Sequence, residues 1–193
     1  MEFNNSLLWQ KKPIAQFLKM SEVVQSLNFI LAIGGIFVLL SSSILLFDFY
    51  ASRVFKNIIS TLGIFIGFIF TLSSSVMTLV YSEAFGFVPC GLCWLQRVFL
   101  YPQVFILGMA LFYKEKIAAR YGLMLSVPGL IISLYQHYLQ MGGNEFLPCP
   151  ASGGDCAKRI MFEFDFVTFP LVSAFLFLFL IVLYIYILKT RTS

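Results

Sequence analysis

Charged residues are scarce in this 193-residue chain, and only 11% of it is Asp, Glu, Lys or Arg. Hydrophobic residues make up 60%, Phe alone occurs 23 times, and the mean hydropathy is +0.90. The chain has too few polar residues to cover the surface of a water-soluble protein. A soluble protein is therefore excluded, and an integral membrane protein is predicted. The net charge of +4 is small and spread over the flanks of apolar stretches. This distribution is typical of anchoring to membrane lipid and speaks against a nucleic-acid-binding protein.

Five apolar stretches are each long enough to cross a membrane as a helix, since about 20 residues rising 1.5 Å each span a hydrocarbon core about 30 Å thick. They cover roughly 27–47, 59–81, 95–113, 117–140 and 166–188. The connections are too short for a separate soluble domain. The first run is longer than the apolar core of a cleaved signal peptide and is expected to stay as a helix.

These stretches predict an all-α integral membrane protein, a four-transmembrane-helix bundle with one additional N-terminal apolar helix. The expected divisions are an interfacial segment at 1–25, the extra transmembrane helix at 26–50, and the four-helix bundle at 51–193 with a polar loop at 141–165.

Only four cysteines are present, and two of them occur as Cys90-Gly91-Leu92-Cys93, where one apolar run has ended and another begins. Two thiols at this spacing on the first turn of a helix can close a small strained disulfide. The helix N-terminus favours the thiolate needed to open that disulfide again. Metal binding and redox exchange are the two chemistries that use such a pair.

The second pair, Cys149 and Cys156, lies in the polar loop among Pro, Gly and Ser residues. The residues between them form a loop short enough to close by a disulfide, and a mobile, exposed disulfide is suited to attack by an external thiol. Two alternatives remain. One is a static staple of the loop, and the other is a four-cysteine zinc site, for which this spacing is wider than usual. Redox exchange is favoured, and no metal is expected.

The basic residues predict an orientation, because positively charged flanks stay on the cytoplasmic side. If the helix at 59–81 starts inside, seven basic residues lie inside and three outside. The seven are Arg53, Lys56, Lys114, Lys116, Arg120, Lys189 and Arg191, and the three are Arg97, Lys158 and Arg159. Both cysteine pairs then lie on the outer, oxidising face. The N-terminal lysines conflict with this orientation, so either the tail lies flat on the outer surface or the first apolar segment does not fully cross.

Two polar side chains near the ends of predicted helices are candidates for function. Arg97 follows Cys93 by four residues, so its guanidinium shares a helix face with that sulfur and can stabilise a thiolate or hydrogen-bond a ligand carbonyl. The alternative is an arginine that only anchors the helix among lipid headgroups. His137, the only histidine, can bind a polar ligand head or serve as an interfacial anchor beside Tyr135 and Tyr138.

The order of these motifs resembles the disulfide bond formation protein B family. The chain has Cys-x-x-Cys-x-x-x-Arg at the start of a membrane helix, then Tyr135-Gln136-His137, then a stretch from Ser152 to Arg159, then Phe169-Pro170 before the last helix. The Cys-Trp-x-x-Arg form and the short outer loop are most similar to the Bacillus-type branch, disulfide formation protein C. The resemblance covers about 59–188, and the N-terminal residues have no counterpart in it.

The resemblance implies a four-helix bundle in a bacterial cytoplasmic membrane that oxidises a thioredoxin-like extracytoplasmic thiol oxidase and passes the electrons to a quinone, either ubiquinone or menaquinone. In this chain Cys149 would be attacked by the partner, and Cys156 would be its resolving mate. Cys90 and Cys93 would reoxidise the loop pair, with Cys93 and Arg97 at the quinone. Gln96 stands where a member of that family has Glu.

Two other readings remain open. One is a non-enzymatic membrane scaffold or transporter-like bundle whose cysteines are structural. The other is an enzyme similar to vitamin K epoxide reductase, which the resemblance disfavours because that family carries its loop pair before its Cys-x-x-Cys.

Overall fold

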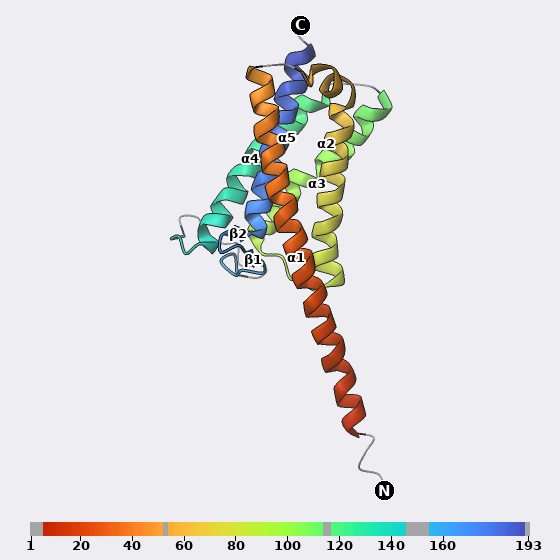
Figure 1. Cartoon of the computed structure of the whole chain (residues 1–193), viewed down its shortest axis with the longest axis vertical. Helices are drawn as coiled ribbons and strands as arrows, with labels where there is room; N and C mark the ends of the chain where they lie inside the picture. Colours follow the sequence, from red (N-terminus) through yellow and green to blue (C-terminus); the bar gives the residue numbers. More distant parts are fainter. Residues whose placement is uncertain (1–5, 52–53, 114–116, 146–154, 192–193) are drawn as a thin grey trace.

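Five long helices run along one another in alternating directions in the computed structural model, which describes residues 6–51, 54–113, 117–145 and 155–191 (Figure 1). They are α1 (Ser6–Tyr50), α2 (Lys56–Leu79), α3 (Gly91–Tyr113), α4 (Ala118–Gln140) and α5 (Phe169–Arg191). Each contains a stretch long and apolar enough to cross a membrane. The prediction of an all-α membrane protein with five apolar helices is therefore confirmed, with ends shifted by a few residues.

The core of the bundle is built around α5, which packs against α4, α1 and α2. Its fully buried side chains include Phe177, Leu180, Leu183 and Tyr184. Large apolar side chains on the outer faces of the other helices are exposed instead, up to 86% for Phe112, because they face lipid in an integral membrane protein.

Helix α4 meets α5 through the small residues Gly122, Gly129 and Ser133, which lie seven and four positions apart on one helix face. A Cβ added at Gly129 would lie 2.5 Å from the ring of Phe177. Such a stripe lets two membrane helices approach closely, which is how helices associate when lipid offers no hydrophobic driving force.

Helix α1 is an integral part of the bundle and packs along α5. A Cβ added at Gly35 would lie 3.1 Å from Val172, whereas no atom lies within 4 Å of a Cβ added at Gly34, so only one glycine of this pair is a contact point. Near its other end, the buried Asp48 carboxylate accepts hydrogen bonds from the backbone N–H of Val54 at 2.8 Å and the hydroxyl of Tyr186 at 2.6 Å. Asp48 thus ties α1 to the start of α2 and to α5.

At about 1.5 Å per residue, the 45 residues of α1 are more than twice as long as a hydrocarbon core is thick. Its N-terminal part projects beyond the other helices (Figure 1). No break in the helix marks the predicted boundary between residues 25 and 26. The interfacial location of the N-terminal segment stays a prediction.

Both cysteine-bearing connections lie at the same end of the bundle as the projecting part of α1 (Figure 1). There α2 continues into one turn of π-helix, η1 (Val80–Ala84), before the chain reaches Cys90 and enters α3. Short π-helical turns are rare in proteins, and those that occur are often found at functional sites. The segment that leads into α5 forms a small antiparallel hairpin of β1 (Phe162–Glu163) and β2 (Val167–Thr168). This end of the bundle therefore gathers the irregular backbone and the thiols.

Candidate active site

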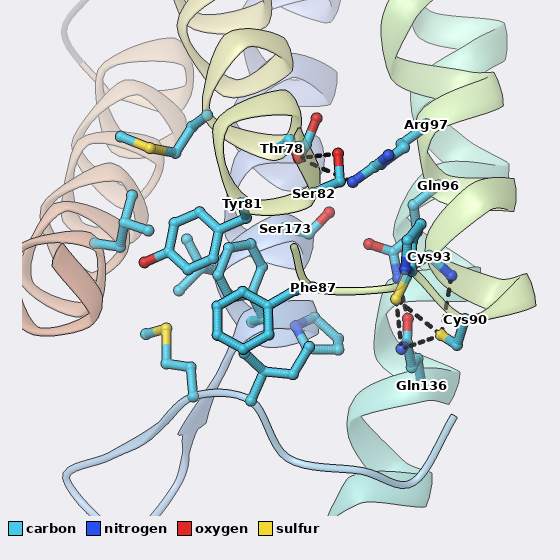
Figure 2. Close-up of a pocket in the computed structure, with 18 of the residues that line it drawn as sticks. Thr78, Tyr81, Ser82, Phe87, Cys90, Cys93, Gln96, Arg97, Gln136 and Ser173 are labelled. Carbon is cyan, nitrogen blue, oxygen red and sulfur yellow. Dashed lines mark hydrogen bonds between the residues drawn. The ribbon is translucent and has the colours of Figure 1, made fainter. Parts of the chain in front are cut away.

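A mostly apolar cavity of about 360 Å³ lies at this end of the bundle, and all five helices contribute to its wall (Figure 2). Leu31 comes from α1, Thr78 from α2, Tyr81 from η1, and the start of α3 brings the thiols. The remaining lining residues from α3, α4, the segment after residue 155 and α5 include Gln96, Arg97, Leu100, Gln136, Gln140, Asp155, Lys158, Met161, Phe169 and Ser173. The cavity brings together residues that are far apart in the sequence.

Cys90 and Cys93 lie side by side in the cavity wall as free thiols, with their Sγ atoms 2.8 Å apart. Cys93 is on the first turn of α3, as predicted, while Cys90 directly precedes the helix and accepts a 3.3 Å hydrogen bond from the backbone N–H of Cys93. The side-chain hydrogen bond with Cys93, together with burial, raises the pKa of Cys90 well above its usual range. The raised pKa favours the protonated form of Cys90.

A buried glutamine on α4 completes the surroundings of the two thiols. Gln136 Nε2 donates to the Sγ atoms of Cys90 and Cys93, both at 3.1 Å, and Gln136 Oε1 accepts from Gln96 Nε2 at 2.7 Å. The motif Tyr135-Gln136-His137 contains this residue, but the sequence pattern alone assigns it no role. Its polarity within a membrane helix indicates a functional residue, because each polar side chain there needs a partner.

Arg97 lies inside the bundle, only 9% exposed, and lines the cavity one turn after Cys93. Its Nη2 donates to the carbonyl oxygen of Thr78 at 2.9 Å, and its guanidinium lies 5.2 Å from the ring of Trp94. Within the described part of the chain, no carboxylate pairs with it. A position inside the bundle differs from that of an arginine that reaches out to the headgroups. Its charge is directed at the cavity.

The wall opposite Arg97 and the thiols is aromatic (Figure 2). Tyr81 stacks on Phe87, with ring centroids 6.0 Å apart and planes 28° apart, and meets Phe169 edge-on at 4.7 Å. The Tyr81 hydroxyl donates to Asn28 Oδ1 of α1 at 2.7 Å, which holds the ring in place. A flat apolar group can therefore lie between an aromatic face on one side and Cys93 and Arg97 on the other.

Cys156 is fully buried and belongs to one apolar cluster with Cys90, Leu92 and Leu139. It is disulfide-bonded, unlike Cys90 and Cys93. The expectation of an exposed loop disulfide is therefore wrong for the Cys156 half of the pair. Its burial next to Cys90 instead places it beside the first pair. Cys149 lies outside the described residues.

The segment that carries Cys156 is fastened to the end of α4 by two hydrogen bonds in opposite directions. Gln140 Nε2 donates to the carbonyl oxygen of Lys158 at 3.0 Å, and Arg159 Nε donates to the carbonyl oxygen of Gln140 at 2.5 Å. These bonds hold the segment against the bundle, where Asp155 and Lys158 also line the cavity.

His137 is not among the described residues that line the cavity. Its Nδ1 lies 2.8 Å from the buried Thr168 Oγ1 of β2. This contact ties the end of α4 to the hairpin, and a ligand-binding role for His137 stays a prediction.

Comparisons with known proteins agree on one family. The family model described as "Disulfide bond formation protein DsbB" matches residues 60–187. The SPbeta prophage-derived disulfide bond formation protein B of Bacillus subtilis (strain 168) is 37% identical over 107 residues, 55% of this chain and 72% of that protein. Disulfide bond formation protein C of the same organism is 34% identical over 113 residues, 57% of this chain and 80% of that protein. No solved structure matches at a significant level.

The matched region takes in nearly all of α2 to α5 with the cavity-lining thiols and arginine, and leaves α1 outside. This agrees with the extent of the resemblance expected from the motifs. Relatives in that family, from Bacillus, are named for disulfide formation, and the chain covers well over two thirds of their length. The chain therefore belongs to the DsbB family of disulfide bond formation proteins, in its Bacillus-type branch, and has a role in forming disulfide bonds.

Proposed function

We propose that the protein is a thiol:quinone oxidoreductase of the bacterial cytoplasmic membrane. It reoxidises a thioredoxin-like extracytoplasmic dithiol oxidase and passes the electrons to a membrane quinone. Both cysteine pairs face outward, as the seven-to-three distribution of basic residues favours. The observation that carries the proposal is the single cavity in which Cys93 and Arg97 face an aromatic wall while Cys156 lies buried beside Cys90.

The relay begins at the loop pair. A thiolate of the reduced partner attacks Cys149 of a Cys149–Cys156 disulfide, forming a mixed disulfide and releasing Cys156. The partner's second thiol then attacks its own mixed-disulfide sulfur. The partner leaves oxidised, and Cys149 and Cys156 are left as thiols, so two electrons have moved to the loop pair. The burial of Cys156 supports Cys149 as the atom reached from outside.

The second exchange passes those two electrons to the Cys90–Cys93 pair. A loop thiolate attacks the Cys90–Cys93 disulfide, and the second loop thiol resolves the bond. This restores the loop disulfide and leaves Cys90 and Cys93 reduced. Cys156 and Cys90 belong to the same buried cluster, which supports an exchange between these two residues. Once the Cys90–Cys93 pair is reduced, the raised pKa of Cys90 favours its protonated form. Cys93 is then the sulfur that reacts with the quinone.

The cavity fits a quinone by its shape and by its donors. A quinone ring is flat and apolar with carbonyl oxygens at its edge, which matches the face of Tyr81 and Phe87 and the guanidinium of Arg97. A bound quinone would supply the oxidant for closing the Cys90–Cys93 disulfide. Arg97 would hydrogen-bond a carbonyl oxygen and offset negative charge there, and the apolar wall would exclude water.

The test is quinone consumption by the purified protein with a reduced thioredoxin-like dithiol oxidase, followed by quinone absorbance with ubiquinone and menaquinone analogues. Arg97→Gln should weaken the apparent quinone affinity by roughly 10- to 100-fold, because a hydrogen bond to a charged group contributes about 1.5–3 kcal/mol. Arg97→Lys should recover only part of the loss, since an ammonium lacks the planar fork.

The matched control is Arg120→Gln, an exposed arginine at the start of α4, at the other end of the bundle, which should behave as the parent. No quinone consumption with an accepted partner would refute the proposed function and favour a scaffold. If the rate of dithiol oxidation depends on quinone concentration in the same way in both Arg97 variants as in the parent, Arg97 only anchors the helix.

A further inference from the structure

The amide of Gln136 on α4 contacts both sulfurs of the Cys90–Cys93 pair (Figure 2). A primary amide has two N–H donors, so both 3.1 Å hydrogen bonds can form at once. Gln136 is only 1% exposed, and water therefore does not compete for these donors. The amide can therefore donate hydrogen bonds to both sulfurs of the pair at the same time.

The orientation of that amide is held by a second glutamine. Gln96 Nε2 donates to Gln136 Oε1 at 2.7 Å, which leaves the Nε2 atom of Gln136 directed at the sulfurs. Gln96 lies on α3, three residues after Cys93, while Gln136 lies on α4. The hydrogen bonds therefore run from α3 across to α4 and back to the thiols, and the separation of the two helices sets the position of the donors.

Hydrogen bonds to sulfur differ between the two redox states of the pair. The sulfurs of a disulfide are weak acceptors, whereas a thiolate accepts charge-assisted hydrogen bonds that are roughly twice as strong as neutral ones. Two donors aimed at the pair therefore stabilise its reduced form more than its disulfide. A dithiol whose reduced form is stabilised is a stronger oxidant in its disulfide form.

We infer that Gln136 is a positioning residue that makes the Cys90–Cys93 disulfide more oxidising by holding both sulfurs of the reduced pair, and that Gln96 fixes its amide. The inference rests on the proposed redox role of this pair and requires neither the quinone nor the partner. Reduction of the pair takes up two electrons and one proton from the reductant, which leaves Cys90 as a thiol and Cys93 as a thiolate, and the second proton of the dithiol reductant goes to the solvent. Gln136 shares its hydrogen atoms without transferring one.

The experiment measures the redox equilibrium of this pair alone. The full-length protein with Cys149→Ala and Cys156→Ala is equilibrated in buffers of reduced and oxidised dithiothreitol, quenched in acid, and alkylated with a mass-tagged maleimide. The fraction reduced is read on a gel. Dithiothreitol supplies both electrons and is itself oxidised to its cyclic disulfide.

Gln136→Met keeps the length of the side chain and removes both donors. It should raise the ratio of reduced to oxidised dithiothreitol needed for half-reduction about tenfold, which for a two-electron couple is a potential about 30 mV more negative. Gln136→Leu also removes the donors and should shift the ratio in the same direction, so either variant tests the inference if the other does not fold. Gln96→Met should give a smaller shift of the same sign, about threefold.

The matched control is Gln103→Met, which removes a second fully buried glutamine, this one on α3. Gln103 bonds to Tyr184 and to the backbone of Phe99, away from the thiols. A ratio for Gln136→Met within twofold of the parent, or an equal shift for Gln103→Met, would overturn the inference. The titration contains no quinone or partner, so its failure and the failure of the proposed function are distinguishable.

Discussion

Gly129→Ala tests the close approach of α4 and α5 that sets the geometry of the site. An added Cβ would lie 2.5, 2.6 and 2.9 Å from three ring atoms of Phe177. The shortest of these is about 0.9 Å less than the 3.4 Å at which ordinary contact begins. Phe177 is fully buried, so its ring cannot swing aside, and the two helices must separate. Overpacking of this kind costs about 1–3 kcal/mol.

A gain in helix propensity of up to about 1 kcal/mol opposes this cost, because Ala is the better helix former. The overlap involves three atoms, so the upper half of the range applies and the net loss is about 1–2 kcal/mol. At roughly 2–4 °C per kcal/mol for a chain of this size, the melting temperature should fall by about 2–8 °C. Gln136 lies two turns further along α4 and should move away from the thiols with the helix.

The assay is thermal unfolding followed by circular dichroism in one detergent, with Gly34→Ala as the matched control. Gly34 is also within a helix, but no atom lies within 4 Å of its added Cβ, so this variant should melt at or slightly above the parent. Equal melting temperatures for the two variants would refute the reasoning, because the contact with Phe177 would then carry no cost.

Three further predictions concern other parts of the molecule. Asn28→Leu leaves the buried Tyr81 hydroxyl without its acceptor and should lower stability by about 1–3 kcal/mol, and adding Tyr81→Phe should restore part of it, which a double-mutant cycle of melting temperatures measures. Additive losses would contradict this coupling. Cys156→Ala should accumulate a mixed disulfide between Cys149 and the partner on non-reducing gels, because the Cys149 thiolate attacks the disulfide of the oxidised partner and Cys156 is no longer there to resolve the bond, whereas capture on Cys90 would mean that the relay runs in another order. In intact, reduced cells a membrane-impermeant maleimide should label at least one thiol of each cysteine pair, and labelling that appears only after the membrane is permeabilised with the protein still folded would contradict the outward orientation.

The membrane helices were predictable because the lipid core imposes a length and a hydropathy on each of them, and both are local properties of the chain. The placement of Cys93 on a first helical turn follows in the same way from the point where an apolar run begins. The registration of Arg97 with Cys93 is also local, because residues four apart on one helix share a face. The family could be inferred from the order of the motifs, because that order can be read directly from the amino-acid sequence.

The tertiary structure decided which side chains from different helices meet. The contacts of Gln136 with the two thiols join residues more than forty positions apart, and the bond between Asn28 and Tyr81 joins α1 to the turn after α2. Such contacts depend on how each helix is rotated and how closely it approaches its neighbour, and an apolar run is nearly uniform around its circumference. The burial of Arg97 and of Cys156 has the same origin, because the exposure of each side chain is set by the segments that pack over it.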